Sequence, residues 1–443
     1  MLRPSLVLSQ SRPLRYGTFF YLYVMQGIPS GFVLTAVTNY LTAEGLDARA
    51  IGTFGALVGL PWGVKFIWGP LVDRYQGSPM GRRRPWVLAS QSLAFLASLG
   101  ILFIDDPIVN FSLLAWAFAG HGLFASVQDI SVDAMAISVV PFAERGRANA
   151  FMKIGMATGQ ALGAAGLAFL LRNNGFHTAA LTQSAILFTF TLVTFFIRER
   201  PIDILLPVSR PTSQEQPAIP AFSADERPHL TFGPLMRELV RSLLVPSSLL
   251  LFLAVATVFV GERLFQKVYY FSLIRNLGWS DTSVSVLSGT YGTLVAVALA
   301  LLGGWLADRV GAFRVLMGMT LVMGALHLGF SFAAPTWVSR EVATAGLVIQ
   351  KTLEPLFSIA ALPVLMGLCR RSVEGAQFAV YMALSNQADI AGIYLSGQLL
   401  PFLSAPAIGM GCGVAMLAAS VGMSVAIRRM APAGRVLIGQ SGY

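Results

Sequence analysis

The chain has 443 residues, of which 55% are hydrophobic and only 12% are charged, and its mean hydropathy is +0.68. A soluble protein normally carries about 25% charged residues, so this supply cannot cover the surface of a water-soluble globule. The net charge of +10 is spread over alternate loops, which argues against a nucleic-acid-binding surface. We therefore expect an all-α protein whose partner is the lipid bilayer, with no nucleic acid bound.

Twelve stretches are long and apolar enough to cross a bilayer, which takes about 20 mostly apolar residues. They fall into two groups of six. The first six lie near 16–40, 51–73, 86–104, 110–139, 148–170 and 179–197, and the second six lie near 247–273, 284–307, 313–333, 342–368, 375–399 and 404–428.

A polar segment separates the two groups of spans. Residues 198–246 are rich in proline, serine and charge, and the part near 233–243 is expected to form an interfacial helix. We therefore expect an N-terminal six-helix bundle at 1–197, a cytoplasmic linker at 198–246 and a C-terminal six-helix bundle at 247–443.

The basic residues mark one side of the membrane. Most loop arginines lie in the loops that share a side with the two termini, and cytoplasmic loops normally carry such an excess of basic residues. Both termini are therefore expected in the cytoplasm. The loops on the other side contain only Arg49, Arg172, Arg275 and Arg340.

A short motif is repeated in the two halves. The stretch GPLVDR at 69–74 recurs as GWLADR at 304–309, in each case at the end of the second span of its half. A second match, between Glu144-Arg-Gly and Glu374-Gly, is separated by nearly the same number of residues. Two matches at one offset indicate duplication of a six-helix unit. Parallel halves of this kind are the design of major facilitator transporters.

We expect the repeated motif to form a gate on the cytoplasmic side. Asp73 can cap a facing helix of the other half, while the arginines that follow can pair with carboxylates nearby. Asp129 and Asp133 lie one turn apart on one helix face, and Lys65 is expected to pair with Asp129. The partner expected for Asp133 is the loop at 82–84 or Lys153. The alternative is a basic loop that only sets topology. The predicted gating residues are Lys65, Asp73, Arg74, Arg82, Asp129, Asp133, Glu144, Arg145, Lys153, Asp308 and Arg309.

Several stretches resemble one group within this superfamily. They are QGIP at 26–29, IGTF at 51–54, LPWGVKFIWGPLVDRY at 60–75, QDISVDA at 128–134 and AQFA at 376–379. Together they resemble the AmpG-like permeases, a group that includes muropeptide, acetyl-CoA and siderophore transporters. The resemblance implies the major facilitator fold and a monomer in the cell inner membrane. It also implies proton-coupled import of a large amphiphilic solute, with a muropeptide or other glycopeptide as the first substrate to consider.

A second set of charged residues lies near mid-membrane, mostly in the second half. Ionisable groups within spans cost a few kcal/mol on insertion scales, so they are functional candidates. Carboxylates there could exchange protons, and three cations could bind an anionic group of the solute. The alternative is that the cations only neutralise the carboxylates. The predicted proton-coupling residues are Glu262, Glu354 and Asp389, and the predicted substrate contacts are Gln26, Arg263, Lys267, Lys351, Tyr21, His121 and Asn386.

Other functions remain open at this point. A siderophore importer of the same group is the first alternative, because the second half is more cationic, and a drug-type efflux transporter is the next. The alternative from another class is a membrane-embedded enzyme. The sequence has no cluster with metal-ligand spacing, no nucleotide-binding loop and no visible nucleophile–base pair. We therefore expect neither catalytic residues nor a metal or cofactor.

Overall fold

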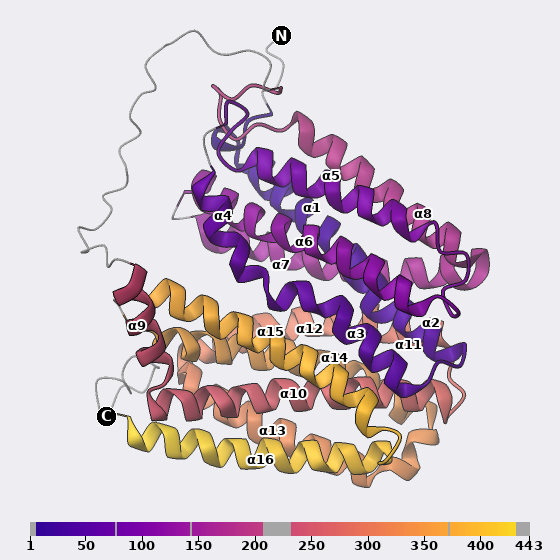
Figure 1. The fold of residues 1–443 in the computed structure, drawn as a ribbon. Coiled ribbons are helices and arrows are strands. Elements are labelled where there is room, and N and C mark those ends of the chain that lie inside the picture. Colours follow the sequence, from indigo (N-terminus) through magenta and orange to yellow (C-terminus); the bar gives the residue numbers. More distant parts are fainter. Residues whose placement is uncertain (1–5, 76–77, 142–143, 207–231, 371–372, 431–443) are drawn as a thin grey trace.

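The computed structural model describes residues 6–75, 78–141, 144–206, 232–370 and 373–430. At a few helical positions within these ranges it describes the backbone but not the side chain. In these ranges the long elements are all helices, and the β-type contact is one isolated bridge between Val7 and Arg198. The expected all-α membrane fold is confirmed. Figure 1 shows the helices lying side by side as two groups, one from each half of the chain.

The first group follows the expected order of spans. Polar interruptions and π-helical turns divide some of these spans into shorter labelled elements. In chain order they are α1 (Arg12–Gly31), the π-helical turn η2 (Phe32–Val37), α2 (Thr38–Ala43), α3 (Ala48–Gly63), η3 (Lys65–Ile67), α4 (Trp68–Arg74), α5 (Arg84–Ile101), α6 (Phe111–Val139), α7 (Arg145–Ala161), η5 (Leu162–Gly166) and α8 (Leu167–Phe196).

The second group begins after the linker. A short helix at the end of the linker, α9, matches the interfacial helix expected there. The elements are α9 (Phe232–Leu243), α10 (Pro246–Arg275), α11 (Asp281–Val286), the π-helical turn η6 (Leu287–Gly292), α12 (Thr293–Val310), α13 (Ala312–Phe332), α14 (Arg340–Gly367), α15 (Glu374–Leu399) and α16 (Ala405–Arg429).

Nine helical segments within the described ranges are long and apolar enough to cross a membrane. One of them, Arg147–Phe196, contains Gly175 at φ 85° and ψ 165°, where the helical path breaks and two of the expected spans meet. The long helices α5 and α15 fall outside that set but lie alongside it (Figure 1). The arrangement is therefore consistent with the twelve spans expected.

The helices pack closely because small residues let backbones approach. A Cβ atom added at Gly159 of α7 would lie 2.9 Å from the Cα of Gly27 in α1, which is too close for any other residue. Without water to drive helices together, membrane helices associate through such close contacts. In the first half α1 packs along α7 and α5 along α6; in the second half α10 and α13 both pack on α16.

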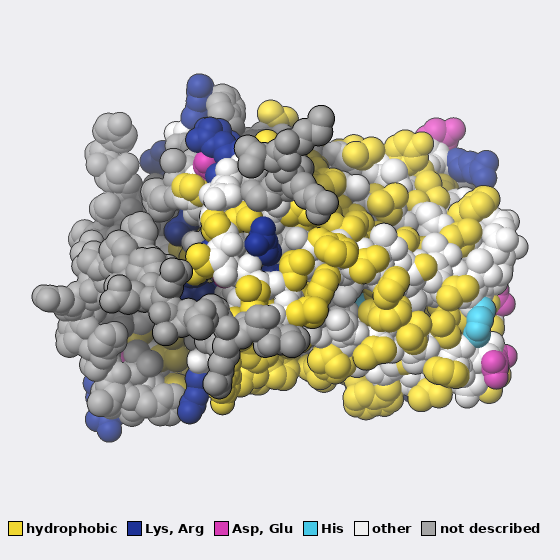
Figure 2. All heavy atoms as spheres, turned by 90° about the horizontal axis from the view of Figure 1, so that it is seen from above, with side chains coloured by type: hydrophobic (Ala, Val, Ile, Leu, Met, Phe, Trp, Pro, Cys, Tyr) yellow, Lys and Arg dark blue, Asp and Glu magenta, His cyan; other side chains and the backbone are white. Residues whose placement is uncertain are grey.

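The surface matches a bilayer environment. Figure 2 shows hydrophobic side chains over the broad middle of the visible face, while most of the visible lysine and arginine side chains gather toward one end. Between the halves, α3 lies along α15. α10 also contacts α2 across the halves, so residues on α3, α10 and α15 lie where the two halves meet.

Candidate functional site

A shared guanidinium forms the centre of the candidate site. The Nη2 atom of Arg263 in α10 lies 3.4 Å from Glu354 Oε2 in α14 and 3.5 Å from Asp389 Oδ2 in α15. The side chains are 20%, 27% and 24% exposed, respectively, so all three border solvent-accessible space inside the bundle. With both carboxylates ionised this cluster carries one net negative charge. It can therefore bind a proton, or lend its cation to an anion.

Neighbouring polar groups hold Arg263 and Glu354 in place. Arg263 Nη1 donates to Gln266 Oε1 at 2.9 Å, and Gln266 Nε2 donates to the carbonyl oxygen of Gln350 at 3.1 Å. Ser358 Oγ donates to Glu354 Oε1 at 3.2 Å. Bonds to fixed partners orient a planar guanidinium, and Gln266 and Glu354 hold that of Arg263 in this way.

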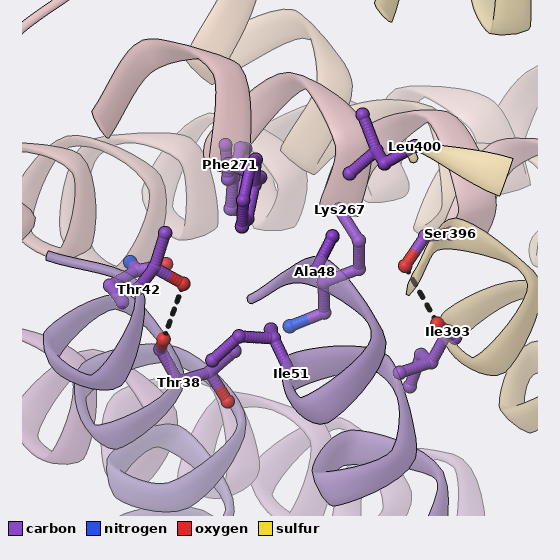
Figure 3. A pocket seen from close by; sticks show the side chains of 11 residues that line it. Thr38, Thr42, Ala48, Ile51, Lys267, Phe271, Ile393, Ser396 and Leu400 are labelled. Atoms are coloured by element: carbon purple, nitrogen blue, oxygen red, sulfur yellow. Dashed lines mark hydrogen bonds between the residues drawn. The ribbon is translucent and has the colours of Figure 1, made fainter. Parts of the chain in front are cut away.

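Lys267 joins the two halves. One turn beyond Arg263, its Nζ donates to the carbonyl oxygen of Leu34 in η2 at 2.6 Å. The lysine borders a narrow pocket between the two halves (Figure 3). Figure 3 shows its side chain reaching from α10 into this pocket, near Ala48 and Ile51. The pocket is lined by Thr38, Asn39, Thr42, Ala48, Ile51, Lys267, Tyr270, Phe271, Ile393, Ser396 and Leu400.

Other polar contacts between the halves lie near the pocket or at mid-membrane. Asn39 Nδ2 donates to Ser285 Oγ at 2.9 Å, and Arg172 of α8 binds Asp281 of α11 at 3.2 Å. Asn386 Nδ2 donates to the carbonyl oxygen of Trp62 at 3.1 Å. Among the hydrogen bonds and ion pairs that the structure describes, those joining the halves lie from mid-membrane to the end away from the arginine-rich loops. These contacts hold that end closed.

Glu262 lies apart from the Arg263 cluster. Its side chain is 2% exposed, and its Oε2 is 3.3 Å from Nε2 of His327 in α13, which is fully buried. The sequence groups Glu262 with Glu354 and Asp389, but the structure turns it toward α13 and α16. His327 is the neighbour that it faces.

On the first half, the expected pair of Lys65 and Asp129 is present, with Nζ 2.9 Å from Oδ2. The described partner of Asp133 is different from the one expected. Tyr23 of α1 donates its hydroxyl to Asp133 Oδ1 at 2.5 Å, and no bond to the arginine loop or to Lys153 is found in the described part of the chain. Lys153 is exposed on α7. The phenol was not foreseen, because nothing in the sequence indicates which face of α1 turns toward α6.

The arginine loop is held by a carboxylate at the start of the linker. Glu199 accepts hydrogen bonds from the backbone N–H groups of Arg82 at 3.3 Å, Arg83 at 2.7 Å and Arg84. Burial raises the pKa of the Glu199 carboxyl above its ordinary value, as it does the pKa of Asp203. The sequence-based gate did not include Glu199, because linker carboxylates carry no apolar or motif signal.

The side chains of Asp73 and Asp308 lie outside the described residues, so their expected capping role is not described. Arg74 lies over the ring of Tyr75. Arg309 is exposed near the end of α12, and Arg145 Nη2 donates to the carbonyl oxygen of Ile137 at 3.1 Å.

Glu144 ties the N-terminal helix to α7. It accepts from Arg15 Nη2 at 2.7 Å and from Arg12 Nε at 2.6 Å. The hydrogen bond from Arg15, and after it the bond from Arg12, holds the pKa of the Glu144 carboxyl below its ordinary value.

The remaining predicted substrate contacts are scattered. Tyr21 bonds Thr194 at 3.1 Å inside the first half, and His121 is buried with Nδ1 2.9 Å from the carbonyl oxygen of Ala94. Gln26 is also buried, and its amide has no described partner. The structure does not bring these residues to the Arg263 cluster. Lys351 lies against Gly292 of η6.

Two helical halves around a polar, charged centre define a class of protein, the membrane transporters that work by alternating access. The chain belongs to the Major Facilitator Superfamily, whose family model matches residues 17–274. It is 28% identical over 361 residues to the anhydromuropeptide permease of Escherichia coli strain K12. This alignment covers 81% of this chain and 69% of that protein. The expected resemblance is confirmed, and the chain is a multi-pass transporter and not an enzyme.

Two further comparisons found an uncharacterized protein and a solved structure. A Haemophilus influenzae protein is 35% identical over 123 residues, which is 28% of each chain. Among solved structures, a bacterial homologue of the human lysosomal transporter Spinster, in an inward-facing and unoccupied conformation, aligns with a TM-score of 0.63. That match covers 98% of this chain and 100% of the other at 15% identity, so it shows the fold alone.

Proposed function

We propose that this transporter imports a large amphiphilic anion, with an anhydromuropeptide as the first candidate, together with protons across the inner membrane. Both termini then lie in the cytoplasm, and the chain works as a monomer. The bundles at 1–197 and 247–443 move relative to each other, joined by the cytoplasmic linker at 198–246. The name of the Escherichia coli relative supports the solute, and the Arg263 cluster supports the coupling.

The sharing of Arg263 between two carboxylates carries this proposal. When Glu354 and Asp389 are both ionised, they occupy the Nη2 side of the guanidinium. A proton on one carboxylate weakens its hold on Arg263, which frees donors for a carboxylate of the solute. Arg binds carboxylates well because its planar fork matches their geometry. Proton and solute therefore bind together, as symport requires.

The closed end supports inward release of the solute. The described polar contacts between halves hold shut the end away from the arginine-rich loops. If those loops are cytoplasmic, this conformation releases solute and proton inward. Opening the other end requires breaking the Lys267–Leu34 and Arg172–Asp281 contacts.

Uptake by reconstituted protein tests the function. Proteoliposomes with an inward proton gradient should accumulate labelled anhydromuropeptide, and a protonophore should abolish accumulation. Glu354→Gln and Asp389→Asn should each abolish driven uptake but leave solute counterflow. The matched control is Glu341→Gln, at the exposed start of the same helix α14, which should transport normally. Accumulation that persists with the protonophore would contradict proton coupling.

A second solute class follows from the cations. Arg263, Lys267 and Lys351 favour anionic groups, so a siderophore or its ferric complex is the next candidate. Competition of labelled muropeptide uptake by ferric chelators separates the two classes. A chelator that is itself accumulated, in a protein that ignores muropeptides, would replace the first candidate.

A further inference from the structure

Glu262 and His327 face each other in a closed apolar site where α10, α13 and α16 meet. The carboxylate oxygen Oε2 and the imidazole Nε2 are 3.3 Å apart, with side chains 2% and 0% exposed. The Phe265 ring lies 5.0 Å from the imidazole. Across α10, the side chains of Met416 and Cys412 approach Gly261, next to Glu262. No mechanism described above uses this pair.

The hydrogen bonds of His327 determine where its protons are. Its Nδ1 is 2.8 Å from the carbonyl oxygen of Met323. A carbonyl oxygen only accepts, so Nδ1 carries hydrogen and donates. In a neutral imidazole the other nitrogen, Nε2, is then an acceptor. The nitrogen that lies 3.3 Å from Glu262 is therefore the one without hydrogen.

An ionised carboxylate is also an acceptor, so the pair needs a proton. Neither Glu262 oxygen has another hydrogen-bond partner among the described residues, and the 3.3 Å contact lacks the alignment of a full hydrogen bond. Two acceptors facing each other in an apolar site repel, and an unpaired buried charge is costly. One proton, on either group, turns the same contact into an attractive one.

The cation beside Glu262 in the chain already has other hydrogen-bond and ion-pair partners. Arg263 is the nearest cation, but its described bonds go to Glu354, Asp389 and Gln266. The Cys412 side chain approaches from α16, beside Gly261. The titratable groups that act on Glu262 from the helices packed around it are Arg263 and Tyr270 on α10, His327 on α13, Glu354 on α14, Asp389 on α15 and Cys412 on α16.

We infer that Glu262 and His327 form a buried proton-binding site, separate from the Arg263 cluster, that holds one proton between the carboxylate and Nε2. Loss of that proton leaves two acceptors in contact and loosens α10 from α13. Because α10 also carries Arg263 and Lys267, proton occupancy here reaches both the cluster and the contact between the halves. The inference extends the proposed proton coupling, but the site can exist without coupling.

Isosteric variants of the purified full-length chain in nanodiscs test the site. Glu262→Gln places an amide N–H donor opposite Nε2 and so mimics the protonated pair. Infrared difference spectra across a pH titration should show one carboxyl or imidazolium signal that is absent in Glu262→Gln and shifted in His327→Gln. Spectra of both variants identical to wild type would overturn the inference.

Stability against pH gives a second readout. Glu262→Gln should lose the fall in Tm that wild type shows once the pair releases its proton at high pH. His327→Phe leaves Glu262 without its partner, so its Tm should fall more at high than at low pH, and adding Glu262→Gln should remove that difference. A Tm profile for Glu262→Gln that parallels wild type at every pH would count against the site.

Uptake measurements separate this inference from the proposed function. Wild-type uptake that ignores the proton gradient would refute coupling, yet the infrared and Tm differences would still support the site. Conversely, proton-driven uptake together with unchanged spectra in Glu262→Gln would keep the proposed function and reject the site.

Discussion

The Lys267 ammonium donates a 2.6 Å hydrogen bond to the carbonyl oxygen of Leu34, and so joins α10 of the second half to the first half. Leu34 lies in η2, a π-helical turn. Bonds in a π-turn run from residue i to i+5, so the wider turn displaces carbonyl groups from their α-helical partners. An ammonium can then bind one of them, and this strut lies at the closed end of the molecule.

Removing the strut should open that end. A hydrogen bond to a charged group is worth about 1.5–3 kcal/mol, so Lys267→Met should shift the closed-to-open ratio by about tenfold or more. The measurement is the labelling rate of Ser396→Cys by an impermeant maleimide, in a chain with Cys369→Ser and Cys412→Ala. Lys351→Met is the matched control and should leave that rate unchanged. Equal rates in wild type and Lys267→Met would show that the bond does not hold the closed state.

Transport should also be sensitive to a larger residue where α3 and α15 approach closely. A Cβ at Gly52 would lie 2.8 Å from the Cα of Gly397, and one at Gly397 would lie 2.9 Å from the Cα of Gly52. Backbone cannot yield as a side chain does, so Gly52→Ala should hold the halves apart and reduce uptake. Gly411→Ala, with nothing within 4 Å of its added carbon, is the control. Normal uptake by Gly52→Ala would mean that the halves do not close at this point.

The Lys65–Asp129 pair should be exchangeable. Reversing either charge leaves two like charges at a partly buried site, where breaking a pair costs about 3–5 kcal/mol, so Lys65→Asp and Asp129→Lys should each reduce uptake strongly. The double exchange restores opposite charges and should recover part of the activity. Lys153→Asp, a reversal at an exposed lysine, should be mild. A double variant no better than either single one would show that this pair has no role in transport.

Glu144 should make the junction of the N-terminal helix with α7 acid-sensitive. Its pKa is held below the ordinary value by the bonds from Arg15 and Arg12. A carboxyl with a lowered pKa stabilises the fold fully above its ordinary pKa of about 4.3, and that contribution is lost as the pH falls through the lowered value.

Thermal unfolding of wild type and Glu144→Gln across pH checks this sign. The variant should have the lower Tm near neutral pH, and the difference should shrink in acid. Glu238→Gln, which breaks an exposed pair with Arg370, should change Tm little because exposed pairs contribute little. A difference that grows as the pH falls would reverse the assigned role of Glu144.

Some features could be predicted from local pattern alone. Membrane residence, the order of spans, the basic side and the family follow from hydropathy, loop charge and short motifs, because each depends only on residues close together in the chain. The Lys65–Asp129 pair could also be predicted, since a long basic side chain and an acidic one lie at similar depth on the second and fourth spans.

The tertiary structure alone decided which of the mid-membrane charges in the second half meet. Residue depth placed Glu262 with Glu354 and Asp389, but helix rotation turns it toward His327 and leaves Arg263 between the other two carboxylates. The π-turns η2, η5 and η6 shift the helical phase of the spans that contain them. Hydropathy sets where a helix crosses the bilayer; its rotation about its own axis is set by packing against neighbours distant in the chain.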